Sequence, residues 1–428
     1  MAKYKTYPEY KDSGVEWLGE IPTHWVVCRL KNLATIKNGQ DYKSVQVEDG
    51  YPVIGSGGQF TFASKFMYDK PSVLLGRKGT IDKPLYINKP FWTVDTMYYT
   101  ELNKGVDAKY LYYLALTIQF SRYSTNTALP SMTQEHLSNY KFSIPRVESE
   151  RRGIIDFLHH ETAKIDILIE KQQQLIELLK EKRQAVISHA VTKGLNPDVQ
   201  MKDSGIEWLG AIPRNWNCVA IKNICKIVNG STPKSSIEEY WDGDIDWFTP
   251  TDLSHKETIQ VNDSLRKITN SGFLSCGTTM VPANTVILSS RAPIGSLAIT
   301  KKSACTNQGC KSLVTFSAQL SKYIYYSLLT FNSPLNNLGR GSTFLELSSD
   351  DLGGFKISLP NDDMGEIIKY IDMTILKIDN LIEKQLQQIA LLKERRTALI
   401  SSAVTGKIDV RHWRAPDEQT TAEAEAIL

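Results

Sequence analysis

Both halves of this 428-residue chain carry short loops in which glycine stands near arginine, lysine, asparagine, glutamine, serine or threonine. Arginine and lysine can donate hydrogen bonds to guanine edges, asparagine and glutamine can pair with adenine, and backbone N–H groups at glycines can approach phosphates. These loops are therefore candidate contacts to double-stranded DNA, although loops of this composition more often form ordinary turns. The candidate residues are Gln59, Arg77, Lys78, Thr125, Asn126, Lys234, Ser290, Arg291, Asn307, Gln308, Arg340 and Ser342.

Side-chain patterns for catalysis are missing from the sequence. The pair Gly406-Lys407 is followed by Ile408 and has no upstream glycine at phosphate-loop spacing, so ATP hydrolysis is not expected. Residues 332–335 (NSPL) depart from an amino-methyltransferase motif at the first proline and at the aromatic residue, and no GxSxG motif occurs. Seven histidines and six cysteines are scattered without metal-ligand spacing. We therefore predict no catalytic residue and no bound metal, and we interpret the cysteines as reduced thiols.

Composition indicates a cytoplasmic protein of several domains. The length corresponds to two to four domains at roughly 100 to 200 residues each. Hydrophobic residues make up 41% of the chain and charged residues 23%, which is ordinary for a globular protein. The first 14 residues have no apolar core of a signal peptide, and the most apolar stretch, 110–118, is far below the ~20 residues of a membrane span. The net charge of +3 does not by itself indicate a polyanionic partner.

The elements that must position the candidate loops come from a tandem duplication. Residues 11–39 recur without a gap as 202–230, with 16 of 29 positions identical. Residues 164–192 recur as 377–405, with 21 of 29 identical. The offsets are 191 and 213 residues, so the two middle segments differ in length by 22 residues, and they differ almost throughout in sequence. We infer that the matching flanks present equivalent surfaces to a repeated partner, while the middles present different surfaces to different ligands.

The second repeated segment has the pattern of a long amphipathic helix that pairs with another helix. We expect these helices over about 149–192 and 363–405, with charged residues on the face away from the apolar series. One polar residue interrupts each series, and we predict that these two glutamines face each other near the centre of an antiparallel pair and set its register. The alternative is that each helix packs against its own domain. The series are Leu158, Ile165, Gln172, Leu179 and Val186, and Ile371, Ile378, Gln385, Leu392 and Leu399.

The middles have the pattern of mixed α/β domains. Short apolar runs broken by glycine and proline predict strands, and two Tyr- and Leu-rich runs predict short helices. A glycine and a proline after the first long helix predict the joint between the halves. The acidic, Ala-rich C-terminal end has the composition of a disordered tail. The expected strands are 72–75, 85–87, 281–288 and 297–300, and the expected short helices are 110–120 and 320–331.

With these features the sequence resembles the specificity subunits of type I restriction-modification enzymes over nearly its whole length. The resemblance rests on the duplicated EWLGEIPTHW and EWLGAIPRNW segments, on Ile144-Pro145 and Leu359-Pro360 before the helices, and on the run from KIDNLIEKQ to SAVTGKIDV near the C-terminus. The Glu-Gln pair usual at the start of such helices is Glu150-Arg151 in the first copy and is absent near Met364-Gly365 in the second.

The resemblance implies two target recognition domains, each reading one half of a split DNA site, separated by two long antiparallel coiled-coil helices with an internal pseudo-two-fold duplication. It also implies two methyltransferase subunits and translocase/nuclease subunits as partners, which would bind the S-adenosylmethionine, ATP and magnesium that this chain does not bind. The expected order is a first recognition domain (1–147), a first long helix (148–193), a linker (194–201), a second recognition domain (202–361), a second long helix (362–406) and a tail (407–428).

Two other classes of protein compete with this interpretation. A coiled-coil scaffold that bridges proteins would share the helices but would not need two dissimilar middles on one frame. A self-sufficient nuclease or methyltransferase would need a catalytic constellation, which the sequence lacks. Both can be tested with purified chain, DNA and the cofactors named above.

Overall fold

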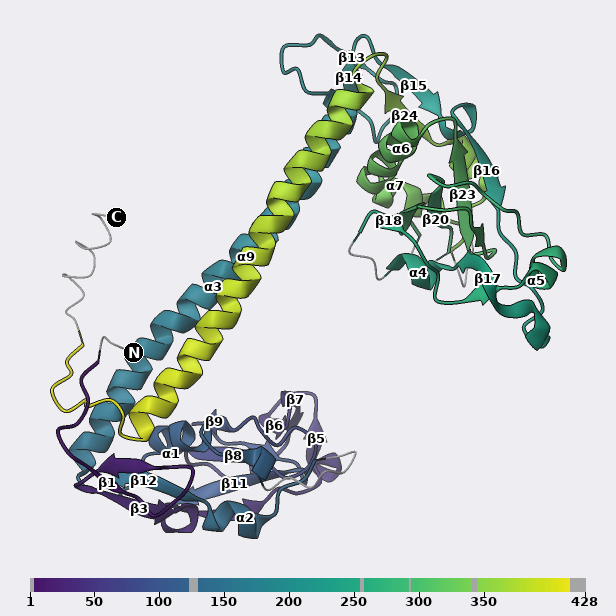
Figure 1. The fold of residues 1–428 in the computed structure, drawn as a ribbon. Coiled ribbons are helices and arrows are strands. Elements are labelled where there is room, and N and C mark those ends of the chain that lie inside the picture. The colour runs from purple at the N-terminus through teal and green to yellow at the C-terminus, as the bar shows by residue number, and fades with distance from the viewer. Residues whose placement is uncertain (1–3, 123–129, 255–257, 292–293, 341–344, 416–428) are drawn as a thin grey trace. The chain divides into compact units, whose positions relative to one another are not determined.

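The computed structural model describes residues 4–122, 130–254, 258–291, 294–340 and 345–415 (Figure 1). The chain forms two compact units, one of residues 1–173 and 386–428 and the other of residues 174–385. Two long helices, α3 (Glu148–Lys193) and α9 (Met364–Val404), each contribute one part to each unit. The units therefore do not follow the linear order of the chain, because each contains segments from both repeats.

Each unit contains the same small frame, built largely from the first repeated segment. In the first unit β1 (Tyr10–Asp12) pairs with β2 (Glu20–Pro22), and β3 (Trp25–Arg29) pairs antiparallel with β12 (Lys141–Pro145). In the second, β13 (Met201–Asp203) pairs with β14 (Ala211–Pro213), and β15 (Asn217–Ala220) pairs with β24 (Lys356–Leu359). The indole N–H groups of Trp17 and Trp208 donate to equivalent carbonyls, those of Lys141 and Lys356, at 3.4 and 3.0 Å. The duplication in sequence is thus a duplication of local structure.

The described residues in the middle of the first unit form two four-stranded sheets and two short α-helices. One sheet has the order β4-β11-β8-β9 and the other the order β10-β6-β7-β5. The bounds are β4 (Ala34–Asn38), β5 (Gln46–Val47), β6 (Tyr51–Gly55), β7 (Gly58–Ala63), β8 (Ser72–Gly76), β9 (Leu85–Ile87), β10 (Trp92–Thr93), β11 (Met97–Leu102), α1 (Ala108–Ala115) and α2 (Gln134–Asn139).

The middle of the second unit has a central sheet similar to that of the first unit. Many of the strands and helices around that sheet differ between the two units. Its sheets have the orders β16-β23-β20-β21-β18 and β19-β17-β22. The mixed α/β prediction is confirmed for both middles. The bounds are β16 (Cys225–Asn229), β17 (Trp241–Phe248), α4 (Pro250–Ser254), β18 (Gln260–Val261), β19 (Lys267–Ile268), α5 (Asn270–Leu274), β20 (Val286–Ser289), β21 (Leu297–Thr300), β22 (Cys305–Thr306), β23 (Cys310–Thr315), α6 (Ala318–Thr330), α7 (Asn332–Asn337) and α8 (Ser349–Gly354).

Two expected elements are shorter than the sequence pattern suggested. The strand expected over 281–288 begins only at Val286, because Pro282 lacks a backbone N–H and Asn284 takes a left-handed backbone with φ of 64°. The helix expected over 110–120 ends at Ala115, although its apolar residues continue to be buried. In both cases buried apolar residues lie beyond the end of the regular hydrogen-bonded strand or helix.

A backbone contact marks the end of the first repeated segment in each unit. A Cβ atom placed on Gly39 would lie 2.0 Å from the carbonyl oxygen of Val94. A Cβ atom placed on Gly230 would lie 2.1 Å from the carbonyl oxygen of Asn307. No side chain fits at such distances, so both positions require glycine. The main chain of the frame therefore touches the main chain of the middle at the same point in both copies.

Each unit buries parts of both long helices in its core. In the first unit Phe157 and Leu158 of α3 and Ala403 of α9 belong to the same buried cluster as Trp25. In the second unit Ile187 and Val191 of α3 share a buried cluster with Ile367 and Ile371 of α9. Ion pairs join the two helices in each unit, between Asp166 and Arg396 at 2.8 Å in the first and between Arg183 and Asp379 at 3.3 Å in the second. In each unit the two long helices therefore pack against the rest of the unit and also contact each other.

The segment 407–415, expected to belong to a tail, instead packs into the first unit. Ile408 and Val410 are buried in its core, and the N–H of Asp409 donates to the carbonyl of Lys5 at 2.8 Å. The hydroxyl of Tyr10 donates to the carbonyl of Gly406 at 3.0 Å. The composition argument for disorder applied to the acidic residues that follow, and those from 416 onward lie outside the described part of the chain.

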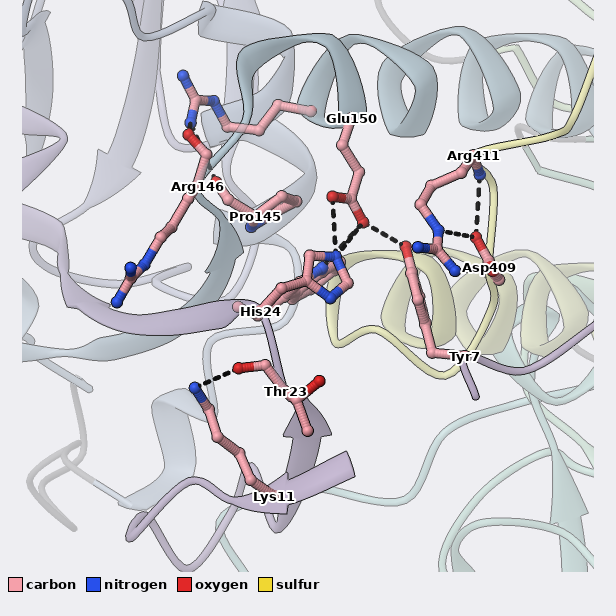
Figure 2. Close-up of polar contacts among 11 residues, drawn as sticks. Tyr7, Lys11, Thr23, His24, Pro145, Arg146, Glu150, Asp409 and Arg411 are labelled. Atoms are coloured by element: carbon pink, nitrogen blue, oxygen red, sulfur yellow. Dashed lines mark hydrogen bonds and ion pairs between the residues drawn. The ribbon is translucent and has the colours of Figure 1, made fainter. Parts of the chain in front are cut away.

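A buried carboxylate ties the N-terminal segment to the start of α3 (Figure 2). The Glu150 side chain accepts hydrogen bonds from the Tyr7 hydroxyl at 2.8 Å and from the Trp25 indole at 3.0 Å, and His24 Nε2 lies 3.0 Å from it. Burial, followed by the hydrogen bond to Glu150, raises the pKa of Tyr7 well above its ordinary value. Arg411 pairs with Asp409 at 2.6 Å beside this group, which we call the Glu150 cluster. Both ends of the described chain therefore meet the first turn of α3.

Candidate nucleic-acid interface

Candidate DNA-contacting residues of the two units follow corresponding strands. Arg77 and Lys78 come directly after β8, and Ser290 and Arg291 come directly after β20. The N–H of Met132 donates to the carbonyl of Arg77 at 2.9 Å, and the N–H of Leu347 donates to the carbonyl of Ser290 at 2.8 Å. This backbone pairing makes Lys78 the counterpart of Arg291.

In the first unit a surface hollow lies beside the Arg77 loop. The hollow has a volume of about 460 Å³ and is lined by Gln59, Phe60 and Asp95, among other residues.

The N–H of Arg77 donates to the carbonyl of Thr96 at 2.9 Å, and its Nη1 donates to the carbonyl of Asp95 at 3.3 Å. Asp95 and Thr96 also line the 460 Å³ hollow, as does the exposed Gln59. Two of the candidate residues, Gln59 and Arg77, therefore lie on the same part of the first unit.

In the second unit both candidate arginines pair with carboxylates. Arg291 Nη2 lies 3.3 Å from Glu346 Oε2, and Arg340 Nη2 lies 2.8 Å from Asp351 Oδ1. Residues 291 and 340 each form a β-bridge with residue 346, so the two arginines lie on neighbouring backbone segments. Both side chains are exposed at the surface. The structure thus brings together two candidate arginines that are distant in sequence, and it pairs them with acidic residues that the sequence analysis did not single out.

The other candidates of the second unit differ in how available their side chains are. Lys234 is exposed. The Gln308 side chain accepts a hydrogen bond from the Thr232 hydroxyl, and the Asn307 side chain accepts one from the N–H of Gly309 at 3.0 Å. Asn307 therefore stabilises its own turn, which is the alternative role that loops of this composition often have.

Ser290 does not fit the prediction of a DNA contact. Its side chain is fully buried, and its hydroxyl has no hydrogen-bond partner in the described part of the chain. The sequence pattern placed it on a loop, but the backbone pairing with Leu347 turns its side chain into the domain. Thr125, Asn126 and Ser342, also predicted contacts, lie outside the described residues.

Sequence reasoning also missed a buried lysine beneath the arginine loop. Lys311 of β23 is buried, and its Nζ donates to Asn229 Oδ1 at 2.9 Å. Burial lowers the pKa of Lys311, and the nearby Glu346 carboxylate offsets only part of this decrease. The signal in the sequence was a lysine inside the apolar run 310–314 (CKSLV), where an unpaired charge would be costly.

The two glutamines predicted to set the helix register lie in different units. Gly153, near the start of α3, lies beside Val410, which follows the end of α9, so the helices are antiparallel in the first unit. The Asp166–Arg396 ion pair then puts Gln172 level with Ala390. In the second unit the Arg183–Asp379 ion pair puts Gln385 level with Glu177. The register of these ion pairs places Ala390 and Glu177, and not the other glutamine, opposite the two glutamine side chains. The mutual pairing of the glutamines stays a prediction.

The described residues contain neither a group of three His, Cys, Asp or Glu side chains arranged to hold a metal ion nor a helix long and apolar enough to cross a membrane. All six cysteines are unpaired thiols. Burial raises the pKa of Cys305 to about 11 and that of Cys225 to about 12. Neither of these two thiols is therefore activated as a nucleophile.

Comparison with known proteins gives one consistent family. The family model described as the type I restriction modification DNA specificity domain matches twice, over residues 22–178 and 213–391. The MjaIX specificity subunit of a type I restriction enzyme from Methanocaldococcus jannaschii is 36% identical over 189 residues, which are 44% of this chain and 43% of that protein. The MjaVIII specificity subunit from the same organism is 25% identical over 92% of this chain and 95% of its own length.

The fold is also similar to that of solved structures. A chain from work on complex assembly and conformational transition of the type I R-M system superposes with a TM-score of 0.69 at 16% identity. The match covers 91% of the present chain and 99% of that chain. At this identity the similarity concerns the fold.

Proposed function

This chain belongs to the type I restriction-modification DNA specificity family, and from that premise we propose that each of its two middles reads one half of a bipartite DNA site. It is a specificity subunit and not an enzyme. The observation that carries the proposal is that two equivalent frames hold unlike loops at corresponding strand ends, with Lys78 in one copy and Arg291 in the other. Equivalent frames suit a common partner, and unlike loops suit different DNA sequences.

We propose that the long helices hold the two recognition domains apart as an antiparallel coiled coil and dock two methyltransferase subunits. Leu168 and Leu391 are exposed in the first unit, and Leu381 and Leu178 are exposed at the same positions of the repeat in the second. Exposed leucines at repeated positions support binding of the same partner to each unit. Translocase/nuclease subunits would join this complex. S-adenosylmethionine, ATP and magnesium would be bound by the partner subunits.

The test of the function is DNA binding by the chain together with its methyltransferase partner. We expect a pool of random duplexes to yield one enriched bipartite sequence in a gel shift, and mapping of methylated adenines to yield the same sequence. A protein scaffold without DNA readout would enrich nothing. The chain alone, incubated with DNA, magnesium, ATP and S-adenosylmethionine, should neither cleave nor methylate, whereas a self-sufficient enzyme would do one of these.

Arg77 provides a test at the level of one residue. If it reads a base, Arg77→Ala should weaken binding to the cognate site by about 1 to 3 kcal/mol and change the preference at one position only. Equilibrium binding to single-base variants of the site measures both effects. Arg29→Ala is the control, because Arg29 is exposed on the frame strand β3. A uniform loss with a smaller salt dependence would indicate a phosphate contact, and no loss would indicate a structural turn.

The glutamine pair provides a test of the spacer. Replacing Gln172 and Gln385 by leucine should stabilise the helices but loosen their register, because the polar residues no longer exclude shifted pairings. A shift by one helical turn moves a domain by ~5 Å, against ~3.4 Å for one base pair, so the double mutant should accept more than one spacer length. Methylation of duplexes with different spacers measures this. Gln173→Leu, which changes an exposed neighbour, is the control. An unchanged spacer preference would mean that domain packing fixes the distance.

A further inference from the structure

The Arg291–Glu346 ion pair lies on the surface of the second unit and joins a candidate DNA-contacting arginine to a carboxylate. Both Arg291 Nε and Nη2 lie 3.3 Å from the same carboxylate oxygen of Glu346, and the two residues also form a β-bridge. The Arg291 side chain is 46% exposed and that of Glu346 is 42% exposed, so the pair faces solvent. At the corresponding bridge of the first unit, Lys78 is opposite Ser131, which carries no charge. The carboxylate is therefore a feature of the second unit.

A carboxylate in this position affects DNA binding in two ways. It restrains the long arginine side chain before DNA arrives, which reduces the conformational entropy lost on binding. It also repels phosphate oxygens, so a contact of Arg291 with the DNA backbone becomes less favourable. A contact with guanine O6 and N7 can use the N–H groups that Glu346 leaves free. The restraint lowers the entropy cost of either contact, and the repulsion of phosphates favours the contact with a base edge.

We propose that Glu346 is a positioning residue that directs Arg291 toward a base edge of the second half-site and disfavours a phosphate contact. The inference rests on the proposed function of the chain. It goes beyond that function by giving a specificity role to an acidic side chain that does not itself touch the base.

The experiment compares Glu346→Gln with the parent chain in complex with the methyltransferase partner. The duplexes are the methylated site found by adenine mapping, its single-base variants in the second half-site, and an unrelated sequence. We expect discrimination at one base pair to fall about 10-fold, within the range of one arginine–guanine contact. We also expect the unrelated duplex to bind more tightly, with a steeper salt dependence, because a negative charge near the phosphates has been removed.

A double-mutant cycle with Arg291→Ala separates positioning from the alternatives. If Glu346 acts through Arg291, Glu346→Gln should not change discrimination at that base pair once Arg291 is alanine. A loss that persists in the Arg291→Ala background would mean that Glu346 contacts a base itself, for example cytosine N4, and would overturn the proposal. An equal loss of affinity for all duplexes, with a lower melting temperature, would overturn it in favour of a structural role. A parent complex without sequence preference would refute the proposed function itself.

Discussion

Replacing residues 40–145 by the equivalent region of another specificity subunit should change one half of the methylated site and leave the other half unchanged. The exchanged region contains the sheets and loops of the first middle, including Arg77 and Gln59. The second middle and both long helices are retained, so the second half-site and the partner surfaces should be retained as well. A complete change of one half-site is the largest effect on DNA recognition that we expect from any alteration of this chain.

Mapping of methylated adenines after the exchange gives both half-sites in one measurement. The reciprocal exchange of the second middle is the control, and it should change the other half only. If the first exchange altered both half-sites, one domain would not read one half, and the assignment of recognition to separate middles would be wrong. The melting temperature of the exchanged chain distinguishes such a result from loss of the fold.

Glu150→Ala should destabilise the first unit by about 3 kcal/mol, because two buried donors, the Tyr7 hydroxyl and the Trp25 indole, lose their acceptor. His24 is partly exposed and can bond to water instead. For a unit of this size such a loss lowers the melting temperature by roughly 6 to 12 °C. Glu148→Ala is the matched control, because Glu148 lies in the same first turn of α3 but is exposed, and it should change stability by less than about 0.5 kcal/mol.

Hydrogen exchange on the intact chain assigns the effect to the correct unit. In Glu150→Ala, amides of β3 and α1 should exchange faster, while those of β15 and α6 should keep their protection. Equal exchange in the Glu150→Ala and Glu148→Ala variants would show that the Glu150 cluster contributes little to stability.

The repeats predicted the parts of the fold that depend on local pattern. The long helices were expected over 149–192 and 363–405 and are found over 148–193 and 364–404. Seven-residue apolar spacing is a property of a single helix and is visible in one sequence. The strands 72–75, 85–87 and 297–300 were also recognised, because glycine and proline delimit them.

The features that the sequence did not reveal depend on contacts between distant residues. Ser290 is buried because its backbone pairs with Leu347, and nothing near Ser290 in the sequence indicates that pairing. Glu346 lies 55 residues from Arg291, so their ion pair has no local signal either. Ile408 and Val410 are buried because the N-terminal segment completes their surroundings, and nothing near them in the sequence indicates that contact.

The close contacts at Gly39 and Gly230 have an evolutionary consequence. At each glycine the frame meets the middle through main-chain atoms, which are the same whatever side chains follow. A recombination event that joins a foreign middle after such a glycine therefore does not need compensating substitutions at that contact. Lineages that keep the glycine can acquire new middles by gene exchange, and selection can then act on what the new middle does without first having to repair the junction.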